Sequence, residues 1–135
     1  MNVEIDHLGI AVRTLEEGLN FYSQILGMKL VAEETVADER VKVAMLPCGS
    51  QNGSPRIELL EATGPESPIT RFLDRRGPGL HHIALRVDDL QSALERLKAS
   101  GARILNEPRI GATGHTYVFV HPESTGGVLL ELVGS

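Results

Sequence analysis

The sequence has one cysteine, no long apolar run and no excess of positive charge, and each absence excludes a class of protein. With Cys48 alone the chain forms no internal disulfide, which fits a reducing compartment. No apolar stretch approaches the roughly 20 residues that a membrane-spanning helix needs. The formal net charge of −5 argues against a nucleic-acid partner, but it is compatible with an anionic small molecule held by a local basic rim.

A targeting signal is not expected either, because a strand-like pattern begins at about residue 3. The chain has 135 residues, 41% hydrophobic and 23% charged, which is typical of one soluble globular domain. We therefore expect a single domain over residues 1–135, with no nucleic-acid or membrane partner and a cytoplasmic location.

Two pairs of similar stretches divide the sequence into two halves. IDHLGIAV at 5–12 is echoed by LHHIALRV at 80–87, and RIELL at 56–60 is echoed by LLELV at 129–133. Each half thus contributes one histidine and one glutamate at matching places. His7 precedes Glu58 by 51 positions (58 − 7), and His82 precedes Glu131 by 49 (131 − 82).

Each half also repeats the order strand, helix and three strands. The first half predicts a strand over 3–12, a helix capped by Thr14 with an apolar stripe of Leu15, Leu19, Tyr22 and Leu26, and strands beginning at Met28 and covering 41–46 and 57–60. The second half predicts a strand over 80–87, a helix from Leu90 to near Gly101, and strands at 103–105, 117–120 and 128–133. A short helix over 69–75 is expected in the connection.

These elements predict an α+β fold of two tandem βαβββ modules. Module one covers about 1–63, the connection about 64–78 and module two about 79–135. A single module would expose a hydrophobic sheet face that two modules together can bury, which favours one domain over two.

The histidines and glutamates are expected to lie away from the helices. The large aliphatic side chains of the same strands should face the helices: Leu8, Ile10 and Val12; Ile57 and Leu59; Ile83, Leu85 and Val87; Leu130 and Leu132. By alternation His7, Glu58, His82 and Glu131 then point to the other face. A carboxylate in so apolar a strand is unfavourable unless it is paired or bound to a metal.

Each of the four residues taken alone has a plainer explanation. A strand histidine is more often a hydrogen-bonded structural residue, and a strand glutamate usually faces solvent at a sheet edge. Duplicated modules can also retain ancestral residues without a shared role. The repetition of all four at equivalent positions nevertheless favours a metal site, and two histidines with two carboxylates suit Co²⁺, Ni²⁺, Mn²⁺ or Zn²⁺.

These stretches resemble the vicinal oxygen chelate (glyoxalase/bleomycin resistance/dioxygenase) superfamily and, within it, the methylmalonyl-CoA epimerase family. The likeness covers essentially the whole chain. Its motifs are DHLGIAV at 6–12, RIELL at 56–60, SPI at 67–69 followed by FL at 72–73, GLHHIA at 79–84 and HPESTGGVLLEL at 121–132, of which the last two are the most specific. The resemblance implies a cupped, barrel-like mixed β-sheet around a metal site.

By position, the family's metal ligands fall on His7, Glu58, His82 and Glu131. The resemblance implies one divalent ion per chain, Co²⁺ before Ni²⁺, Mn²⁺ or Zn²⁺. The position of Glu58 is a glutamine in some epimerases, so the charge there varies. A further strand carboxylate that is proposed as a base in some members corresponds to Lys42, which is unsuited as a carboxylate base.

The implied reaction interconverts (R)- and (S)-methylmalonyl-CoA, in propionate metabolism and by a homodimer. A base removes the α-proton, and the metal stabilises the resulting enolate. Because Lys42 is unsuited, the bases expected are Glu131 first and Glu58 second. Basic side chains should meet the CoA phosphates, but the sequence does not assign them.

Other residues give weaker signals. His81 is expected to be structural because it points away from the ligands. Ser124–Gly127 can form a turn near the CoA chain or a plain hairpin turn, and His115 can gate the site or simply be exposed.

Two alternatives to the epimerase share its fold. Glyoxalase I (lactoylglutathione lyase) uses the same four ligand types on a glutathione hemithioacetal. A non-catalytic drug-binding resistance protein needs no metal residues, so the presence of all four counts against it.

Overall fold

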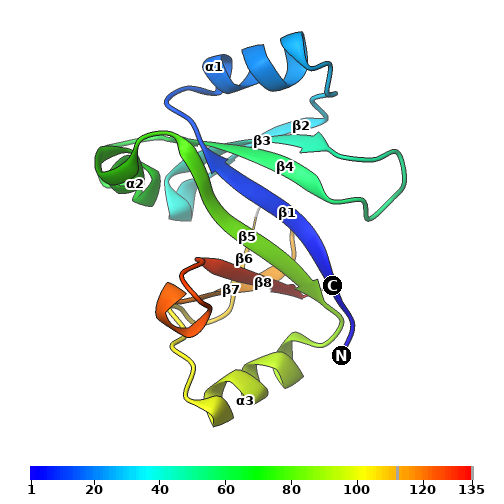
Figure 1. The fold of residues 1–135 in the computed structure, drawn as a ribbon, viewed down its shortest axis with the longest axis vertical. Helices are drawn as coiled ribbons and strands as arrows, with labels where there is room; N and C mark the ends of the chain where they lie inside the picture. The colour runs from blue at the N-terminus through cyan, green and yellow to red at the C-terminus, as the bar shows by residue number, and fades with distance from the viewer. Residues whose placement is uncertain (112, 135) are drawn as a thin grey trace. The chain divides into compact units, whose positions relative to one another are not determined.

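The computed structural model describes residues 1–111 and 113–134, which form two compact units. The N-terminal unit is His7–His81, and the C-terminal unit is Met1–Asp6 with His82–Ser135. Both are mixed α and β structure, as the sequence predicts (Figure 1). The first strand begins in the C-terminal unit and the fifth begins in the N-terminal unit. The extents of the two modules and their union in one domain stay predictions.

The N-terminal unit follows the predicted order of strand, helix and three strands. Its elements are β1 (Val3–Ala11), α1 (Leu15–Leu19), the π-helix η1 (Asn20–Ile25), β2 (Ala32–Val36), the short 3₁₀ helix η2 (Ala37–Glu39), β3 (Val41–Pro47), β4 (Arg56–Ala62) and α2 (Pro68–Arg76). The strands run in the order β2-β3-β4-β1, with β1 and β4 parallel and the other pairs antiparallel. The predicted short helix of the connection is α2.

The C-terminal unit repeats this arrangement. Its elements are β5 (Gly79–Val87), α3 (Leu90–Ser100), β6 (Arg109–Ile110), β7 (Thr116–Val120), the 3₁₀ helix η3 (Pro122–Ser124) and β8 (Leu130–Gly134). The order is β5-β8-β7-β6, again with the first and last strands of the repeat, β5 and β8, parallel. The parallel pair at equivalent places supports the two-module interpretation of the sequence.

The core of the N-terminal unit lies between α1 and one face of its sheet. Thr14 accepts a hydrogen bond from the Glu17 amide at 3.1 Å and so starts the helix at Leu15. Leu15 then packs with buried Val12, Ala44, Leu46 and Leu59, and the less buried Ile10, Leu19 and Ile57 surround them. The predicted aliphatic faces are therefore confirmed at Ile10 and Val12 and at Ile57 and Leu59.

The core of the C-terminal unit is built in the same way under α3. Its buried members are Val87, Ala93, Leu94, Val118, Val120 and Leu132, packed with the partly buried Leu85, Leu90, Leu97, Ile104 and Leu130. The predicted aliphatic faces are confirmed here at Leu85 and Val87 and at Leu130 and Leu132. The opposite face of both sheets is left for other side chains.

The apolar stripe of the first module's helix ends at Tyr22, four residues before the predicted end at Leu26. The Leu26 amide donates to the Phe21 carbonyl, five residues back, at 2.8 Å, which is the hydrogen bonding of the π-helix η1. This wider turn rotates the following residues off the stripe. Leu26 is consequently 59% exposed, and the prediction that it packs with Leu15 and Leu19 is wrong.

Two predicted strands differ from the structure. The strand expected from Met28 begins at Ala32, because Met28 and Leu30 pack into the core and pairing starts only at the hydrogen bond from Val31 to Met45. Residues 103–105 make a single bridge, Ile104 to Val120, instead of a strand. The ladder stops there because the Phe119 amide donates its hydrogen bond to the Asn106 side-chain oxygen, at 2.8 Å.

No helix among residues 1–111 and 113–134 is long and apolar enough to cross a membrane.

An arginine of β5 holds two carboxylates of the first residues of β1. Arg86 donates to Asp6 at 3.0 Å and to Glu4 at 3.1 Å, and the side chain of Asp6 is only 7% exposed. The hydrogen bond to Glu4 makes the largest contribution to raising the pKa of Arg86 above its ordinary value, and the hydrogen bond to Asp6 raises this pKa further. Arg86 therefore stays charged and compensates the buried carboxylate.

We expect Arg86→Met to destabilise the protein by about 2 kcal/mol, because Asp6 keeps its buried charge and loses its counter-ion. Chemical denaturation at neutral pH measures this difference. The exposed Arg71→Met is the control, with a change within about 0.5 kcal/mol. An Arg86 variant as stable as the control would show that Asp6 does not depend on the guanidinium.

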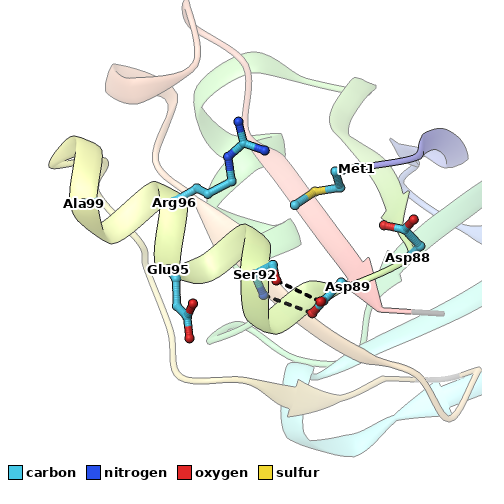
Figure 2. Close-up of a pocket in the computed structure, with 7 residues that line it drawn as sticks. All are labelled: Met1, Asp88, Asp89, Ser92, Glu95, Arg96 and Ala99. Atoms are coloured by element: carbon cyan, nitrogen blue, oxygen red, sulfur yellow. Dashed lines mark hydrogen bonds between the residues drawn. The ribbon is translucent and has the colours of Figure 1, made fainter.

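The first turn of α3 is capped by Asp89, which lies in a pocket of about 760 Å³ on the C-terminal unit (Figure 2). Asp89 accepts from the Ser92 amide at 3.0 Å and from the Ser92 hydroxyl at 2.8 Å. These hydrogen bonds, the one from the amide first, lower the pKa of Asp89 below its ordinary value. A carboxyl whose pKa falls on folding stabilises the fold while it is ionised.

Asp89→Asn should therefore destabilise the protein at neutral pH and lose its effect in acid. The contribution of the charge is present above the ordinary carboxyl pKa and disappears as the pH falls through the lowered pKa of the folded state. Melting curves of both proteins between pH 7 and pH 2.5 test this. A difference in Tm that is constant over the whole range would contradict it.

Candidate functional site

The N-terminal unit holds one of the predicted histidine–glutamate pairs on the sheet face opposite α1. His7 lies on β1 and Glu58 on the neighbouring β4, where Gly9 is its partner in the register. The His7 Nδ1 is 3.3 Å from the Glu58 Oε2. Both residues are buried, with exposed fractions of 5% and 7%. The alternation of side chains along the two parallel strands thus brings an imidazole and a carboxylate together away from solvent.

A residue that the sequence analysis missed, Arg56, completes this group. It is the register partner of His7, and it lies two residues before Glu58 on the same face of β4. Its Nε and Nη2 are 2.8 Å and 2.7 Å from the same oxygen, Oε2 of Glu58. The spacing of two on a strand is the signal that could have found it.

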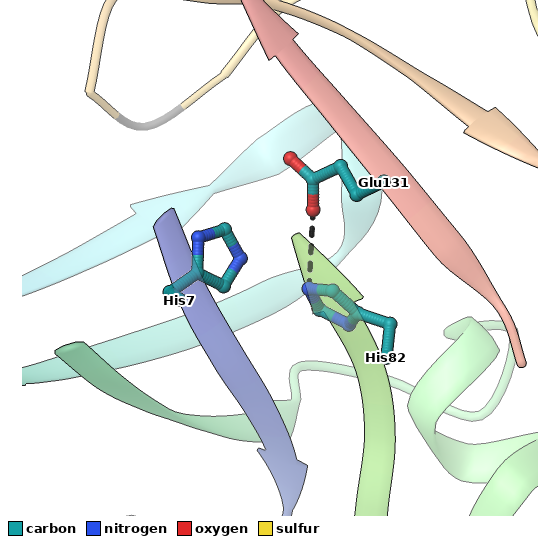
Figure 3. A group of neighbouring side chains, drawn as sticks. All are labelled: His7, His82 and Glu131. Atoms are coloured by element: carbon teal, nitrogen blue, oxygen red, sulfur yellow. Dashed lines mark ion pairs between the residues drawn. The ribbon is translucent and has the colours of Figure 1, made fainter. Parts of the chain in front are cut away.

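The C-terminal unit holds the other pair. His82 lies on β5 and Glu131 on β8, where Ala84 is its partner in the register. The His82 Nε2 is 3.1 Å from the Glu131 Oε1, and Figure 3 shows the two side chains directed toward each other. The exposed fractions of the two side chains are 6% and 12%. The sequence repeat is therefore also a repeat of side-chain contacts.

Aromatic rings enclose the second pair. Phe119 is the partner of Glu131 in the antiparallel register and meets the His82 ring edge-on, with the ring centroids 5.5 Å apart. Tyr117 in turn meets Phe119 at 5.7 Å, packed with Ala84 and Val133. These apolar walls limit access of water to the imidazole and the carboxylate. The alternation of Tyr117 and Phe119 on β7 was not used in the sequence analysis, although it predicts this face.

Within each unit the donors fit a divalent metal ion. An imidazole nitrogen and a carboxylate oxygen lie about one hydrogen-bond length apart, in surroundings where an uncompensated carboxylate would be unfavourable. Among the described residues, no buried side-chain nitrogen or oxygen lacks a hydrogen-bond partner. The pairs are therefore satisfied without an ion, and each offers the nitrogen and oxygen ligands that borderline divalent metals take.

Lys42 is exposed. It lies on the face of β3 that is opposite to the face on which Glu58 lies. Its register partner on β4 is Glu61, whereas Glu58 pairs with Met45. Any side chain at position 42, a carboxylate included, would thus lie on the α1 side of the sheet. On the side of Glu58, β3 carries only apolar residues, Val43 and Met45 among them.

The weaker candidates of the sequence lie outside the two pairs. The His81 ring packs edge-on against Phe72 of α2 at 5.0 Å, a structural contact, and His115 is exposed. Ser124–Gly127 is a turn held by its own chain, in which the Gly127 amide donates to the Pro122 carbonyl at 2.8 Å and Ser124 Oγ accepts from the Arg103 amide at 2.9 Å.

The family of the chain follows from its relatives. The sequence model described as the glyoxalase/bleomycin resistance protein/dioxygenase superfamily matches residues 6–119. The chain belongs to this superfamily. The ethylmalonyl-CoA/methylmalonyl-CoA epimerase of Cereibacter sphaeroides is 38% identical over 131 residues, covering 95% of this chain and 95% of that protein. The prediction of an enzyme of the methylmalonyl-CoA epimerase family within the superfamily is confirmed.

Solved structures of this superfamily agree. A methylmalonyl-CoA epimerase in complex with methylmalonyl-CoA and NH4+ superposes with a TM-score of 0.93 at 34% identity, covering 100% of this chain and 96% of that one. A variant of the Streptomyces coelicolor methylmalonyl-CoA epimerase in complex with 2-nitronate-propionyl-CoA superposes with a TM-score of 0.91 at 35% identity, covering 97% and 96%.

Proposed function

We propose that this protein interconverts (R)- and (S)-methylmalonyl-CoA. The proposal rests on one observation above all, the buried histidine–glutamate pair that each unit repeats, in a chain that is related over 95% of its length to a named epimerase. A lone buried pair would be explained by structure. Two equivalent pairs in an enzyme of this family are better explained by a shared reaction.

We further propose that His7, Glu58, His82 and Glu131 bind one divalent metal ion per chain. Co²⁺ is the first choice, and Ni²⁺, Mn²⁺ and Zn²⁺ have ligand preferences compatible with the same donors. Bound there, such an ion would act as a Lewis acid toward the thioester oxygen, an effect worth several kcal/mol. The repeat of the pairs and the chemistry of the donors support this ligand set.

The reaction needs a base at the α-carbon between the thioester and the carboxylate. We propose that Glu131 takes the proton as the C–H bond breaks, and that the electron pair moves toward the thioester carbonyl. A proton returned to the opposite face gives the other epimer with no net change in composition. His82, 3.1 Å away, positions the Glu131 carboxylate, and Phe119 shields both from water.

Glu58 is our proposed second base. β3 supplies no carboxylate beside it, because Val43 and Met45 lie on that face and Lys42 on the other. The lysine at position 42, where some family members have a carboxylate, therefore removes no acid or base from the surroundings of Glu58. A glutamate at 58 is the carboxylate that the N-terminal unit offers on this face.

Chelator treatment should abolish epimerisation of methylmalonyl-CoA, and added Co²⁺ should restore it, since an unaided carboxylate is too weak a base for this proton at neutral pH. The measurement is the loss of optical activity of one epimer, with metals added back singly. The ethylmalonyl thioester and the hemithioacetal of methylglyoxal and glutathione are assayed in parallel. Turnover of the hemithioacetal alone would replace the proposal by a glyoxalase I activity, and metal-independent turnover would refute the metal's role.

Glu131→Gln should lower exchange of the α-proton with deuterated solvent by at least about 100-fold while acyl-CoA still binds, because general base catalysis contributes about 10²–10⁴. Proton NMR of the substrate in D₂O follows the exchange, and calorimetry follows binding. The exposed Glu16→Gln is the matched control. Exchange at the wild-type rate in a metal-binding Glu131 variant would exclude this residue as a base.

Two expectations drawn from the resemblance and from composition accompany this proposal. We propose that the protein acts as a homodimer in the cytoplasm, in propionate metabolism. Light scattering of the purified protein measures the first property, and a mass of about 14.6 kDa, that of one chain, would contradict it.

A further inference from the structure

Three nitrogen atoms of the N-terminal unit lie close to one atom, Oε2 of Glu58. They are Nε and Nη2 of Arg56, at 2.8 Å and 2.7 Å, and Nδ1 of His7 at 3.3 Å. Two N–H groups of one planar guanidinium on the same oxygen fix the position of that oxygen. Glu58 is therefore held from its own strand by Arg56 and from β1 by His7.

Burial distinguishes this ion pair from the exposed pair of Arg40 and Glu66. The side chain of Arg56 is 18% exposed and that of Glu58 is 9% exposed. The Arg40–Glu66 pair has the same separation of 2.7 Å, but its side chains are 54% and 76% exposed. A buried charge that loses its partner destabilises strongly, whereas an exposed pair contributes little. The two pairs thus form a matched comparison within one protein.

The sequence repeat shows that Arg56 belongs to one module only. In the alignment of RIELL with LLELV, Arg56 corresponds to Leu129, so the position two residues before Glu131 carries no charge. The two carboxylates are equivalent in fold but differ in this neighbour. The position of Glu58 is a neutral glutamine in some related epimerases. The guanidinium of Arg56 compensates the extra negative charge that a glutamate brings to this position.

We propose that Arg56 is the counter-ion and positioning residue of Glu58, and that the two residues act as one unit. Through a hydrogen bond from Nε and an ion-pair contact from Nη2, both to Oε2, Arg56 keeps the Glu58 carboxylate at a fixed place. The catalytic part of this inference rests on the proposed epimerase function. The counter-ion part concerns the folded protein alone.

A double-mutant cycle on the chelator-treated protein tests the pairing. Arg56→Met and Glu58→Gln should each lower the Tm by roughly 5 °C, and the double variant should lose clearly less than the sum of the two, since neither charge then remains unpaired. Arg40→Met and Glu66→Gln form the control cycle, with shifts of about 1 °C or less and no coupling. Additive shifts at Arg56 and Glu58 would overturn the counter-ion role.

Kinetics on the metal-loaded protein test the positioning. Arg56→Met should lower kcat for methylmalonyl-CoA at least about tenfold with KM changed less than about threefold, because the CoA portion still binds while Glu58 is misplaced. Arg56→Lys, which keeps the charge but not the two-pronged geometry, should recover the Tm more fully than kcat. A wild-type kcat in a folded Arg56→Met protein would overturn the positioning role.

The two proposals fail separately. A wild-type protein that does not epimerise methylmalonyl-CoA refutes the proposed function, while the Tm cycle still decides whether Arg56 compensates Glu58. An active wild-type protein with additive Tm shifts and an unaffected Arg56→Met variant refutes the present inference alone. The Arg56→Lys variant also covers the case in which Arg56→Met does not fold.

Discussion

Strand alternation between two unlike faces is the constraint on which the arrangement of each unit depends. One face of each sheet must be apolar enough to bury a helix, and β1, β4, β5 and β8 meet this with regularly spaced aliphatic residues. The same alternation directs the intervening side chains to the other face, where His7, Glu58, His82 and Glu131 lie. The hydrophobic effect that seats the helices thereby also fixes where the polar groups point.

Parallel pairing is the second part of this arrangement. In each unit the histidine strand and the glutamate strand are the first and last strands of the repeat, and they are neighbours. Residues about fifty positions apart in the sequence therefore meet without any loop having to place them. Because strands are held by a regular ladder of hydrogen bonds, the distance between imidazole and carboxylate is set by the register, and rigid elements of this kind hold functional groups more closely than loops do.

The sequence predicted the parts of the fold that depend on periodicity and failed where a single side chain or turn decides. Local spacing correctly predicted which aliphatic side chains face the helices, among them Ile10, Leu59, Leu85 and Leu132. It also correctly predicted the helix cap at Thr14. The exposure of Leu26 was not predicted, since a π-helix differs from an α-helix by one residue per turn and leaves no pattern of its own. At the site, the pairs follow from the repeat, but Arg56 has no counterpart in the second half and so gave no repeated signal.

The hydrogen bond of Asn106 affects more than the length of a strand. A strand edge with free amides and carbonyls can recruit any other extended chain, and sheet proteins protect such edges. Asn106 occupies the Phe119 amide on the outer side of β7, just where a continuous strand at 103–105 would have extended the ladder. The Asn106 side-chain oxygen takes the Phe119 amide, and β6 pairs with Tyr117 and Thr116 farther along the same side of β7. Asn106 therefore uses an amide that the gap between residue 105 and β6 would otherwise leave open to another extended chain.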